Sequence, residues 1–241
     1  MLTVDEVSMR RGKTLTLDAV TFSLPKGDTL AVVGESGAGK STLIAVVLGM
    51  LKPVAGRIAW SGGPVSACRP ALVMQEPRAA FNPVLPLRRS ISEPLTARGA
   101  SVPQERLARL CDGLELPQTL LDRRPGEVSI GQAQRAGILR ALVAAPPLVL
   151  FDEPLSALDA VTQKHTARLI ADLQREEGFA ALIVTHDLGY AAAFSDEIAV
   201  LRKGRIEELS PTSDFVEAPR SEYGLALRDA AFALGALEKV A

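Results

Sequence analysis

Cysteine and histidine are scarce in this sequence. Its 241 residues include two cysteines, Cys68 and Cys111, and two histidines. The cysteines form no CxxC pair and have no histidine at the spacing of a metal site. This composition excludes a disulfide framework and indicates two reduced thiols of a cytosolic protein.

The sequence also lacks a long apolar segment. No run approaches the ~18 apolar residues that a membrane-spanning helix needs. Residues 1–6 have no basic stretch followed by an apolar one, so we expect no signal peptide. Any role at a membrane therefore has to come through a partner.

Neither sign of charge is in excess. Lys and Arg number 27 against 28 Asp and Glu, and the formal net charge is -1, which argues against a broad nucleic-acid-binding surface. Hydrophobic residues make up 47% of the chain, which is enough for a sizeable core and argues against disorder. The length predicts one large α/β domain, or one domain with an inserted subdomain.

The apolar pattern changes along the chain. Short apolar or β-branched runs predict strands at 15–24, 29–33, 57–60, 71–74, 148–151, 181–184 and 197–201. Helical spacing predicts helices at 43–51, 91–95, 104–114 and 131–144, and a polar turn from 211 before a helical end. The alternation favours a parallel sheet with crossover helices. We expect a core from 1–84 and 146–241, and a helical subdomain from 85–145.

A complete phosphate-binding motif, G-x-x-x-x-G-K-[ST], lies between an expected strand and an expected helix. Its glycines let the backbone wrap around phosphate, and the helix N-terminus favours an anion. We expect Lys40 to reach the β- and γ-phosphates of ATP, and the Ser41 hydroxyl to bind Mg²⁺. The expected phosphate-binding residues are Gly34, Glu35, Ser36, Gly37, Ala38, Gly39, Lys40, Ser41 and Thr42.

Two carboxylates end an apolar strand further along the chain. The strand is expected at 148–151, and Asp152 and Glu153 follow it directly. Beside a phosphate-binding loop, such a pair indicates Mg²⁺ binding by Asp152 and activation of the attacking water by Glu153 as general base.

Four more segments follow the order found in one family. Residues 129–135 resemble the signature LSGGQxQR, 154–159 a D-loop, 73–77 a Q-loop, and 184–187 a switch-histidine strand. With the phosphate loop, they make essentially the whole chain resemble the nucleotide-binding subunit of an ABC transporter. The resemblance implies an ATPase coupled to transport. It also implies a RecA-like P-loop NTPase core with an N-terminal antiparallel β subdomain and an inserted α-helical subdomain.

The resemblance also assigns roles to single residues. Gln75 would ligate Mg²⁺ and hold the attacking water, and His186 would donate a hydrogen bond to the γ-phosphate. Asp159 would lie at the seam of a head-to-tail dimer, in which each subunit's signature contacts the other subunit's ATP. The signature residues in that role are Ser129, Gly131 and Gln132.

The partners implied by the resemblance are proteins of a membrane complex. They are a second ATPase subunit, two transmembrane permease subunits, and an extracytoplasmic substrate-binding protein that acts on the permeases. No nucleic acid is implied. The chain would lie peripherally on the cytoplasmic face of the inner or plasma membrane.

The sequence departs from the family pattern at two positions. Ile130 replaces the first signature glycine, and a β-branched residue adds bulk and does not easily adopt positive φ. We therefore expect a weak signature site, an intact Lys40/Glu153 half, and a dimer of two different chains. No aromatic residue precedes Gly12 to stack on adenine, and Arg11 is the candidate for that contact.

Residues 75–77, 81–84, 92–95 and 211–225 resemble the branch that imports peptides, nickel and metallophores. Some members carry a cysteine-rich extension, which this chain lacks, so we expect no iron–sulfur cluster.

One alternative function is that of a soluble ABC ATPase that acts on nucleic acid or ribosomes. The others are a small-molecule P-loop kinase and a catalytically silent structural subunit.

Overall fold

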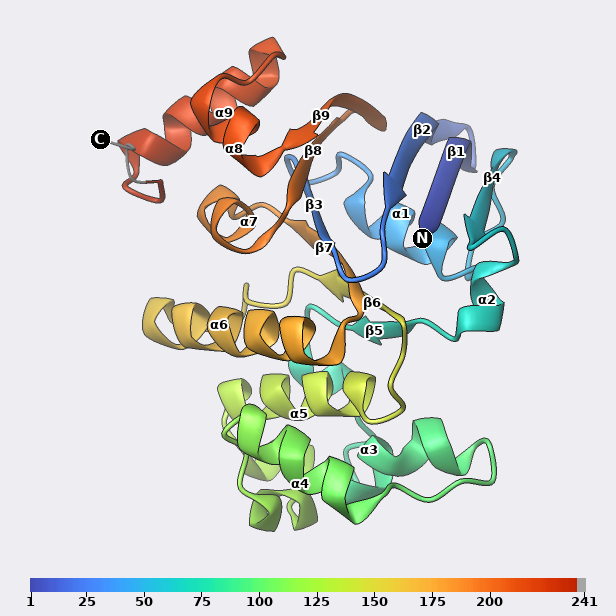
Figure 1. Ribbon diagram of the computed structural model, residues 1–241, viewed down its shortest axis with the longest axis vertical. Coiled ribbons are helices and arrows are strands. Elements are labelled where there is room, and N and C mark those ends of the chain that lie inside the picture. Colours follow the sequence, from blue (N-terminus) through green and yellow to red (C-terminus); the bar gives the residue numbers. More distant parts are fainter. Residues whose placement is uncertain (238–241) are drawn as a thin grey trace. The chain divides into compact units, whose positions relative to one another are not determined.

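The computed structural model describes residues 1–237, which divide into two compact units. The first comprises Met1–Pro70 and the chain from Ala180 onward, and the second is Ala71–Phe179. Figure 1 labels the helices and strands in chain order. No helix in the described residues combines the length and the hydropathy needed to cross a bilayer.

The first unit contains the β-rich ends of the chain. Its elements are β1 (Leu2–Arg11), β2 (Thr14–Leu24), β3 (Thr29–Val33), α1 (Lys40–Val47), β4 (Ala55–Trp60), α2 (Val65–Cys68), β7 (Ala180–Thr185), α7 (Leu188–Phe194), β8 (Glu197–Arg202), β9 (Arg205–Pro211), α8 (Thr212–Glu217) and α9 (Glu222–Ala233). Strands β2, β1 and β4 form an antiparallel sheet in that order.

Strand β1 was not expected from the sequence, because bulges interrupt its alternation. Its register with β2 shifts between Val4 and Val7, and Glu6 has a φ of 47°. Ala19, on the neighbouring strand, has a φ of 48°. A bulge adds a residue to one strand and breaks the two-residue period that marks a strand in a sequence.

The parallel strands β7, β3 and β8 form the core of the first unit, and β9 pairs antiparallel with β8. All residues of β3 and β7 are buried, which explains their nearly continuous apolar sequences. Helices α7, α8 and α9 contribute to one hydrophobic cluster with β3 and β8. Its buried members are Ala31, Val33, Leu188, Ala191, Ile198, Val200, Phe215 and Ala231.

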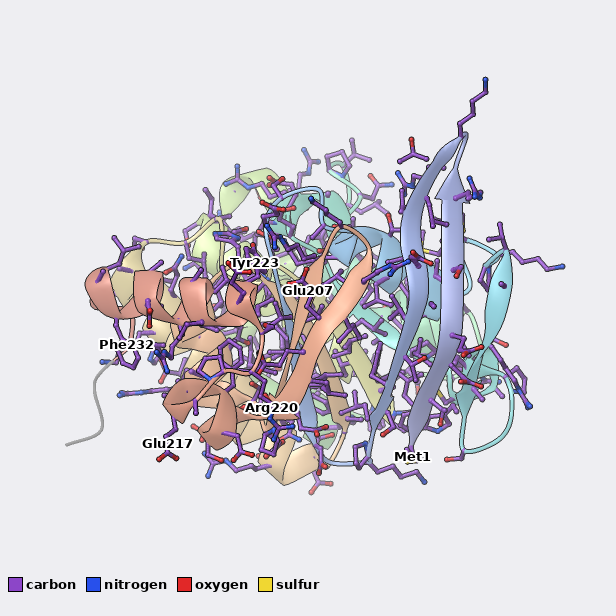
Figure 2. The ribbon with its side chains drawn as sticks, turned by 90° about the horizontal axis from the view of Figure 1, so that it is seen from above. Met1, Glu207, Glu217, Arg220, Tyr223 and Phe232 are labelled. Atoms are coloured by element: carbon purple, nitrogen blue, oxygen red, sulfur yellow. The ribbon has the colours of Figure 1, made fainter. Side chains whose placement is uncertain are left out.

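The last helix, α9, is fixed to the strands by polar contacts. Tyr223 and Phe232 lie at its opposite ends (Figure 2), and the Arg202 guanidinium lies 4.5 Å from the centre of the Tyr223 ring. The buried Glu208 carboxylate accepts hydrogen bonds from the backbone N–H groups of Arg220 and Ser221, at 2.9 and 2.8 Å. A short helix, α8, replaces the polar turn expected from 211.

The second unit contains all three helices that the sequence predicts between 85 and 145. Its elements are β5 (Ala71–Val73), the 3₁₀ helix η1 (Pro77–Ala80), α3 (Leu87–Thr96), α4 (Gln104–Gly113), η2 (Gln118–Asp122), η3 (Pro125–Glu127), α5 (Ile130–Leu142), β6 (Leu148–Asp152) and α6 (Ala160–Glu177). Strands β5 and β6 pair in parallel. The sequence-based division at 85 and 145 stays a prediction.

Helix α5 packs inside the second unit against η1, α3, α4, β5 and α6. Small residues allow this close packing on several sides, and Ala133, Ala136 and Gly137 are all buried. Helix α4 is tied to α6, because Arg106 forms a 2.5 Å ion pair with Glu177. Helix α5 is therefore well packed from Ala133 to Leu142.

Candidate active site

The phosphate loop begins where β3 ends. Gly34 is buried, and a Cβ added to it would lie 2.1 Å from the carbonyl oxygen of Leu201. A side chain at this position would collide with the backbone of β8. The neighbouring strand therefore explains why the motif starts with glycine.

Gly39 ends the loop and caps α1. Its φ of 112° is unfavourable for residues with a side chain, and an added Cβ would lie 2.6 Å from the carbonyl oxygen of Thr16. The first turn of α1, Lys40 to Thr42, has no acidic residue. The positive end of the helix dipole therefore suits an anion such as phosphate.

Lys40 is buried and lies across the loop that precedes it. Its Nζ donates hydrogen bonds to the carbonyl oxygens of Gly34, at 2.8 Å, and Glu35, at 3.2 Å. The Gly204 N–H donates to the carbonyl of Ala38 at 2.9 Å, so the turn between β8 and β9 also supports the loop. Ser41 is exposed and Thr42 is buried.

His186 and the phosphate loop lie at the same edge of the parallel strands. Val33 pairs with Thr185 in register, so Gly34 and His186 both follow the carboxyl ends of neighbouring strands. His186 is exposed, and Asp187 beside it caps α7 by accepting the Tyr190 N–H at 2.9 Å. The structure thus brings the switch histidine and the phosphate loop to one edge of the first unit.

The predicted water-activating residues lie together in the second unit. Val73 pairs with Phe151, so Gln75 and the pair Asp152 and Glu153 follow the same edge of β5 and β6. Gln75 is exposed, and both carboxylates are half-buried. Glu153 has a φ of 46°, and its carbonyl closes a turn by accepting the Ser156 N–H at 3.2 Å. Strained backbone of this kind clusters at functional sites.

The signature segment begins α5 with a reciprocal cap. The Ser129 Oγ accepts the Gln132 N–H at 3.1 Å, and the Gln132 Oε1 accepts the Ser129 N–H at 2.9 Å. This capping box satisfies two backbone N–H groups at the start of the helix. Ser129 is exposed.

A family model described as "ABC transporter" matches residues 17–156, more than half of the chain. The chain is also 36% identical over 228 residues to the oligopeptide transport ATP-binding protein OppF of Escherichia coli, covering 89% of this chain and 68% of OppF. The chain belongs to the ABC transporter family. The probable D,D-dipeptide transport ATP-binding protein DdpF of Escherichia coli is 36% identical over 216 residues, covering 88% of this chain and 69% of DdpF.

Solved ABC structures have the same fold. A dimeric post-hydrolysis state of the ATP-binding cassette MJ0796, bound to ADP and Pi, is 27% identical, with a TM-score of 0.78 over 88% of this chain and 99% of that one. The cbiO1 protein of Clostridium perfringens, at 24% identity, supports the fold alone, with a TM-score of 0.80 over 97% and 95% of the two chains. The predicted fold class and the prediction of an ABC ATPase are confirmed.

The residues of this ABC protein fit ATP and Mg²⁺. Open space surrounds Gly37, so a ligand can approach the backbone of the phosphate loop there, and the predicted metal ligands Ser41, Gln75 and Asp152 all carry oxygen donors. The described residues contain no group of three or more His, Cys, Asp or Glu side chains able to hold a metal. Mg²⁺ is commonly held by one or two carboxylates together with phosphates, which agrees with such a donor set.

The signature of this ABC protein differs from our expectation at Ile130. It is the first residue of α5, and it is not among the described residues with positive φ. Ile130 is therefore not forced into positive φ, as we had expected, because the helix provides an ordinary conformation for a β-branched residue. Its bulk is still presented at the start of the helix, where Ile130 is 45% exposed.

The glycine that remains in the signature has a packing role. A Cβ added to Gly131 would lie 3.1 Å from Cγ2 of Thr162 on α6. Asp159 caps that helix by accepting the N–H groups of Val161 and Thr162, at 3.2 and 3.1 Å, and the Thr162 hydroxyl at 2.7 Å. These hydrogen bonds, with the Thr162 hydroxyl first, lower the pKa of Asp159.

Arg11 lies at the turn between β1 and β2 and is exposed. Strand β2 also supplies the Thr16 carbonyl beside Gly39, and Thr16 lies near the same turn as Arg11. The contact of Arg11 with adenine stays a prediction.

The sequence did not predict the roles of Thr16 and Leu201. These residues contact the loop glycines through their backbone carbonyls, which no sequence motif reveals.

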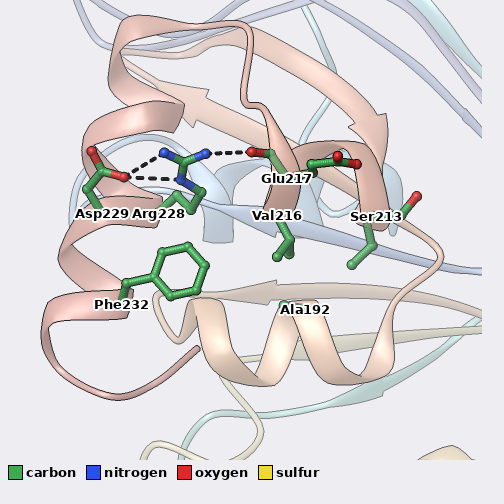
Figure 3. Close-up of a pocket in the computed structure, with 8 residues that line it drawn as sticks. Ala192, Ser213, Val216, Glu217, Arg228, Asp229 and Phe232 are labelled. Carbon is green, nitrogen blue, oxygen red and sulfur yellow. Dashed lines mark hydrogen bonds and ion pairs between the residues drawn. The ribbon is translucent and has the colours of Figure 1, made fainter. Parts of the chain in front are cut away.

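A hollow of about 1050 Å³ also lies in the first unit, lined by residues of α7, α8 and α9 (Figure 3). The Arg228 guanidinium lines it and donates to the Glu217 carbonyl and the Asp229 carboxylate, at 2.8 and 2.7 Å. Phe232 and Val216 add apolar surface. None of the residues that the sequence predicts for the ABC site lines this hollow.

Proposed function

We propose that this ABC ATPase powers the uptake of a peptide, or of nickel or a metal chelate, through partner permeases. The observation that carries the proposal is the 36% identity to OppF and DdpF, which are named for oligopeptide and D,D-dipeptide transport. Peptides have the stronger support, from these names. The proposal of nickel or a metal chelate as substrate rests only on the sequence resemblance to that importer branch.

The proposed complex contains two ATPase subunits arranged head to tail. The dimeric form of a structural relative at 27% identity supports a pair of ATPase subunits, and the head-to-tail arrangement comes from the family resemblance alone. Two permeases and an extracytoplasmic binding protein complete the proposed complex, and the chain lies on the cytoplasmic face of the membrane. In this arrangement the core from 1–84 and 146–241 holds ATP, and the helical subdomain from 85–145 presents the signature.

Binding of ATP is assigned to the phosphate loop and the start of α1. Backbone N–H groups of the loop and the Lys40 ammonium neutralise phosphate charge, and Arg11 stacks on adenine. Ser41, Gln75 and Asp152 hold Mg²⁺, which lowers the charge of the phosphates when it is bound.

Hydrolysis is assigned to three side chains. The Glu153 carboxylate accepts a proton from the attacking water, and the Gln75 amide orients that water. His186 donates a hydrogen bond to the γ-phosphate and stabilises charge that develops there. Glu153 and His186 directly follow the largely buried strands β6 and β7, and Gln75 lies two residues after β5, which supports this proposal.

The signature is assigned to the opposite subunit's nucleotide. Ser129, Gly131 and Gln132 form the contact surface at the N-terminus of α5, and Asp159 lies near the seam. The exposed bulk of Ile130 weakens this contact, so the ATP held by the partner is the weaker one. Such asymmetry favours a partner encoded by a different gene.

Replacement of the proposed base tests the function. In a complex purified from detergent-solubilised membranes through a tag on this chain, Glu153→Gln should lower the ATPase rate by about 10²- to 10³-fold while ATP still binds. The matched control, Glu105→Gln, changes an exposed carboxylate at the start of α4 and should leave the rate unchanged. Purification without any membrane protein, or phosphate transfer to a small molecule, would overturn the proposal.

A further inference from the structure

The segment that follows Gln75 reaches the signature directly. Gln75 precedes η1, where Pro77 is buried and the exposed Arg78 extends toward the loop before α5. The Arg78 Nη2 donates a hydrogen bond to the carbonyl oxygen of Val128 at 2.8 Å, across 50 residues of sequence. Helix η1 also packs against α5.

The carbonyl that Arg78 holds belongs to the same peptide group as the N–H of Ser129. A peptide group is planar, so rotation of the Val128 carbonyl also turns the Ser129 N–H. That N–H donates to the Gln132 Oε1 at 2.9 Å as one half of the capping box. Arg78 and Gln132 therefore hold the two ends of one peptide plane, directly before the signature helix.

A second hydrogen bond fixes the same loop. The Leu87 N–H, at the start of α3, donates to the carbonyl of Arg123 at 2.9 Å. Val128 itself is buried at 5% exposure. The loop from 123 to 128 is thus held at both ends by the chain that follows Gln75, and its orientation depends on that chain.

We propose that Arg78 is a positioning residue that links the Gln75 segment to the signature cap through the Val128 peptide group. The consequence for nucleotide rests on the proposed function, in which Ser129 contacts the ATP of the partner subunit. A change in the Gln75 segment would then turn the Ser129 N–H and hydroxyl relative to that ATP. Neighbouring hydrogen bonds in such a chain strengthen one another, so loss of the first weakens the second.

Hydrogen exchange in the isolated full chain tests the link itself and requires no partner. We expect Arg78→Met to speed exchange of the Ser129 and Gln132 amides about fivefold, which corresponds to loss of one hydrogen bond. Arg78→Lys keeps a donor and should recover part of the protection. Exchange at parent rates in Arg78→Met would overturn the proposal.

The matched control is Arg140→Met. Arg140 lies on α5, the helix that begins at the signature cap. The Arg140 Nε donates to the carbonyl of Ser90 at 3.0 Å, so this variant also removes an arginine-to-carbonyl bond of the second unit. It should leave exchange at Ser129 and Gln132 unchanged. Equal acceleration in both variants would mean general loosening of α5 and would also overturn the proposal.

Photolabelling with azido-ATP tests the consequence in the purified complex. Arg78→Met should lower labelling of the partner ATPase about fivefold and leave labelling of this chain unchanged, because each signature serves the opposite nucleotide. Equal loss on both chains, or no loss on either, would overturn the positioning role. A parent complex without a second ATPase or without ATP turnover would instead overturn the proposed function, and the exchange result would stand.

Discussion

Two helices of this protein begin at expected nucleotide contacts, and they begin in different ways. Helix α1 starts from Gly39, which has no side chain to act as a cap. Helix α5 starts from Ser129, whose hydroxyl and backbone form a closed capping box with Gln132. The first relies on backbone geometry, and the second relies on its own side chains.

This difference indicates how each helix start tolerates change. The two ends of the phosphate loop pack against backbone, with the carbonyls of Leu201 and Thr16 against Gly34 and Gly39. The signature faces solvent at Ser129 and Ile130, and its glycine contacts a side chain. The loop therefore has little freedom to accept new atoms at these two glycines, whereas the signature accommodates the bulk of Ile130.

The largest expected effect comes from an added methyl group in the phosphate loop. Gly39→Ala should lower ATP affinity about 100-fold, because the new Cβ combines an unfavourable φ with a 2.6 Å approach to the Thr16 carbonyl. Binding of a fluorescent ATP analogue to the isolated chain measures this. Gly131→Ala is the matched control and should change affinity less than about threefold, since Thr162 can yield. Equal losses of ATP affinity in the two variants would contradict the difference in tolerance between the phosphate loop and the signature.

The next effect concerns the capping box. Ser129→Ala should lower the free energy of unfolding by about 1 kcal/mol, because the Gln132 N–H loses its acceptor. Urea denaturation of the isolated chain measures this. Ser36→Ala in the phosphate loop should change stability by less than about 0.5 kcal/mol, since α1 begins at a glycine. A smaller loss of unfolding free energy in Ser129→Ala than in Ser36→Ala would contradict the difference between the two helix starts.

A smaller effect is expected from the bulk of Ile130. Ile130→Gly in the assembled complex should raise ATP turnover about threefold, which corresponds to about 0.7 kcal/mol. Ile130→Ala should give most of this gain, because it removes bulk and keeps a good helix former. Steady-state ATPase rates decide the matter, and unchanged binding and turnover would show that Ile130 does not weaken the signature.

The smallest effect is a dependence on pH beside the signature. The Thr162 hydroxyl and nearby N–H groups hold the pKa of Asp159 below its ordinary value of 3.8. Its cap therefore acts fully above pH 3.8 and is lost as the pH falls through the lowered pKa. As the pH falls through this lowered pKa, hydrogen exchange of the Val161 and Thr162 amides should accelerate relative to the rate of unstructured amides at the same pH. Asp159→Asn should flatten this dependence, and an unchanged profile would argue against the ionised cap.

Much of the site was accessible from the sequence, because its motifs are local. The spacing of Gly34, Gly39 and Lys40 between a strand and a helix predicted the phosphate loop, and the structure has that context. The S-x-x-Q pattern at Ser129 and Gln132 is also a sequence signal for a capping box, which the structure contains. The roles of these residues in ATP hydrolysis stay predictions.

The sequence by itself determined the order of the motifs, the family, and the buried strands that carry Asp152 and His186. Only the tertiary structure decided that carbonyls of Leu201 and Thr16 surround the loop glycines, that bulges hide β1, and that Arg78 holds the peptide before Ser129. A motif can be recognised in a sequence because it depends on the spacing of nearby residues. The contacts of Leu201, Thr16 and Arg78 join residues far apart in sequence. They use backbone atoms, which every residue has, or one surface arginine, so only the packed structure reveals them.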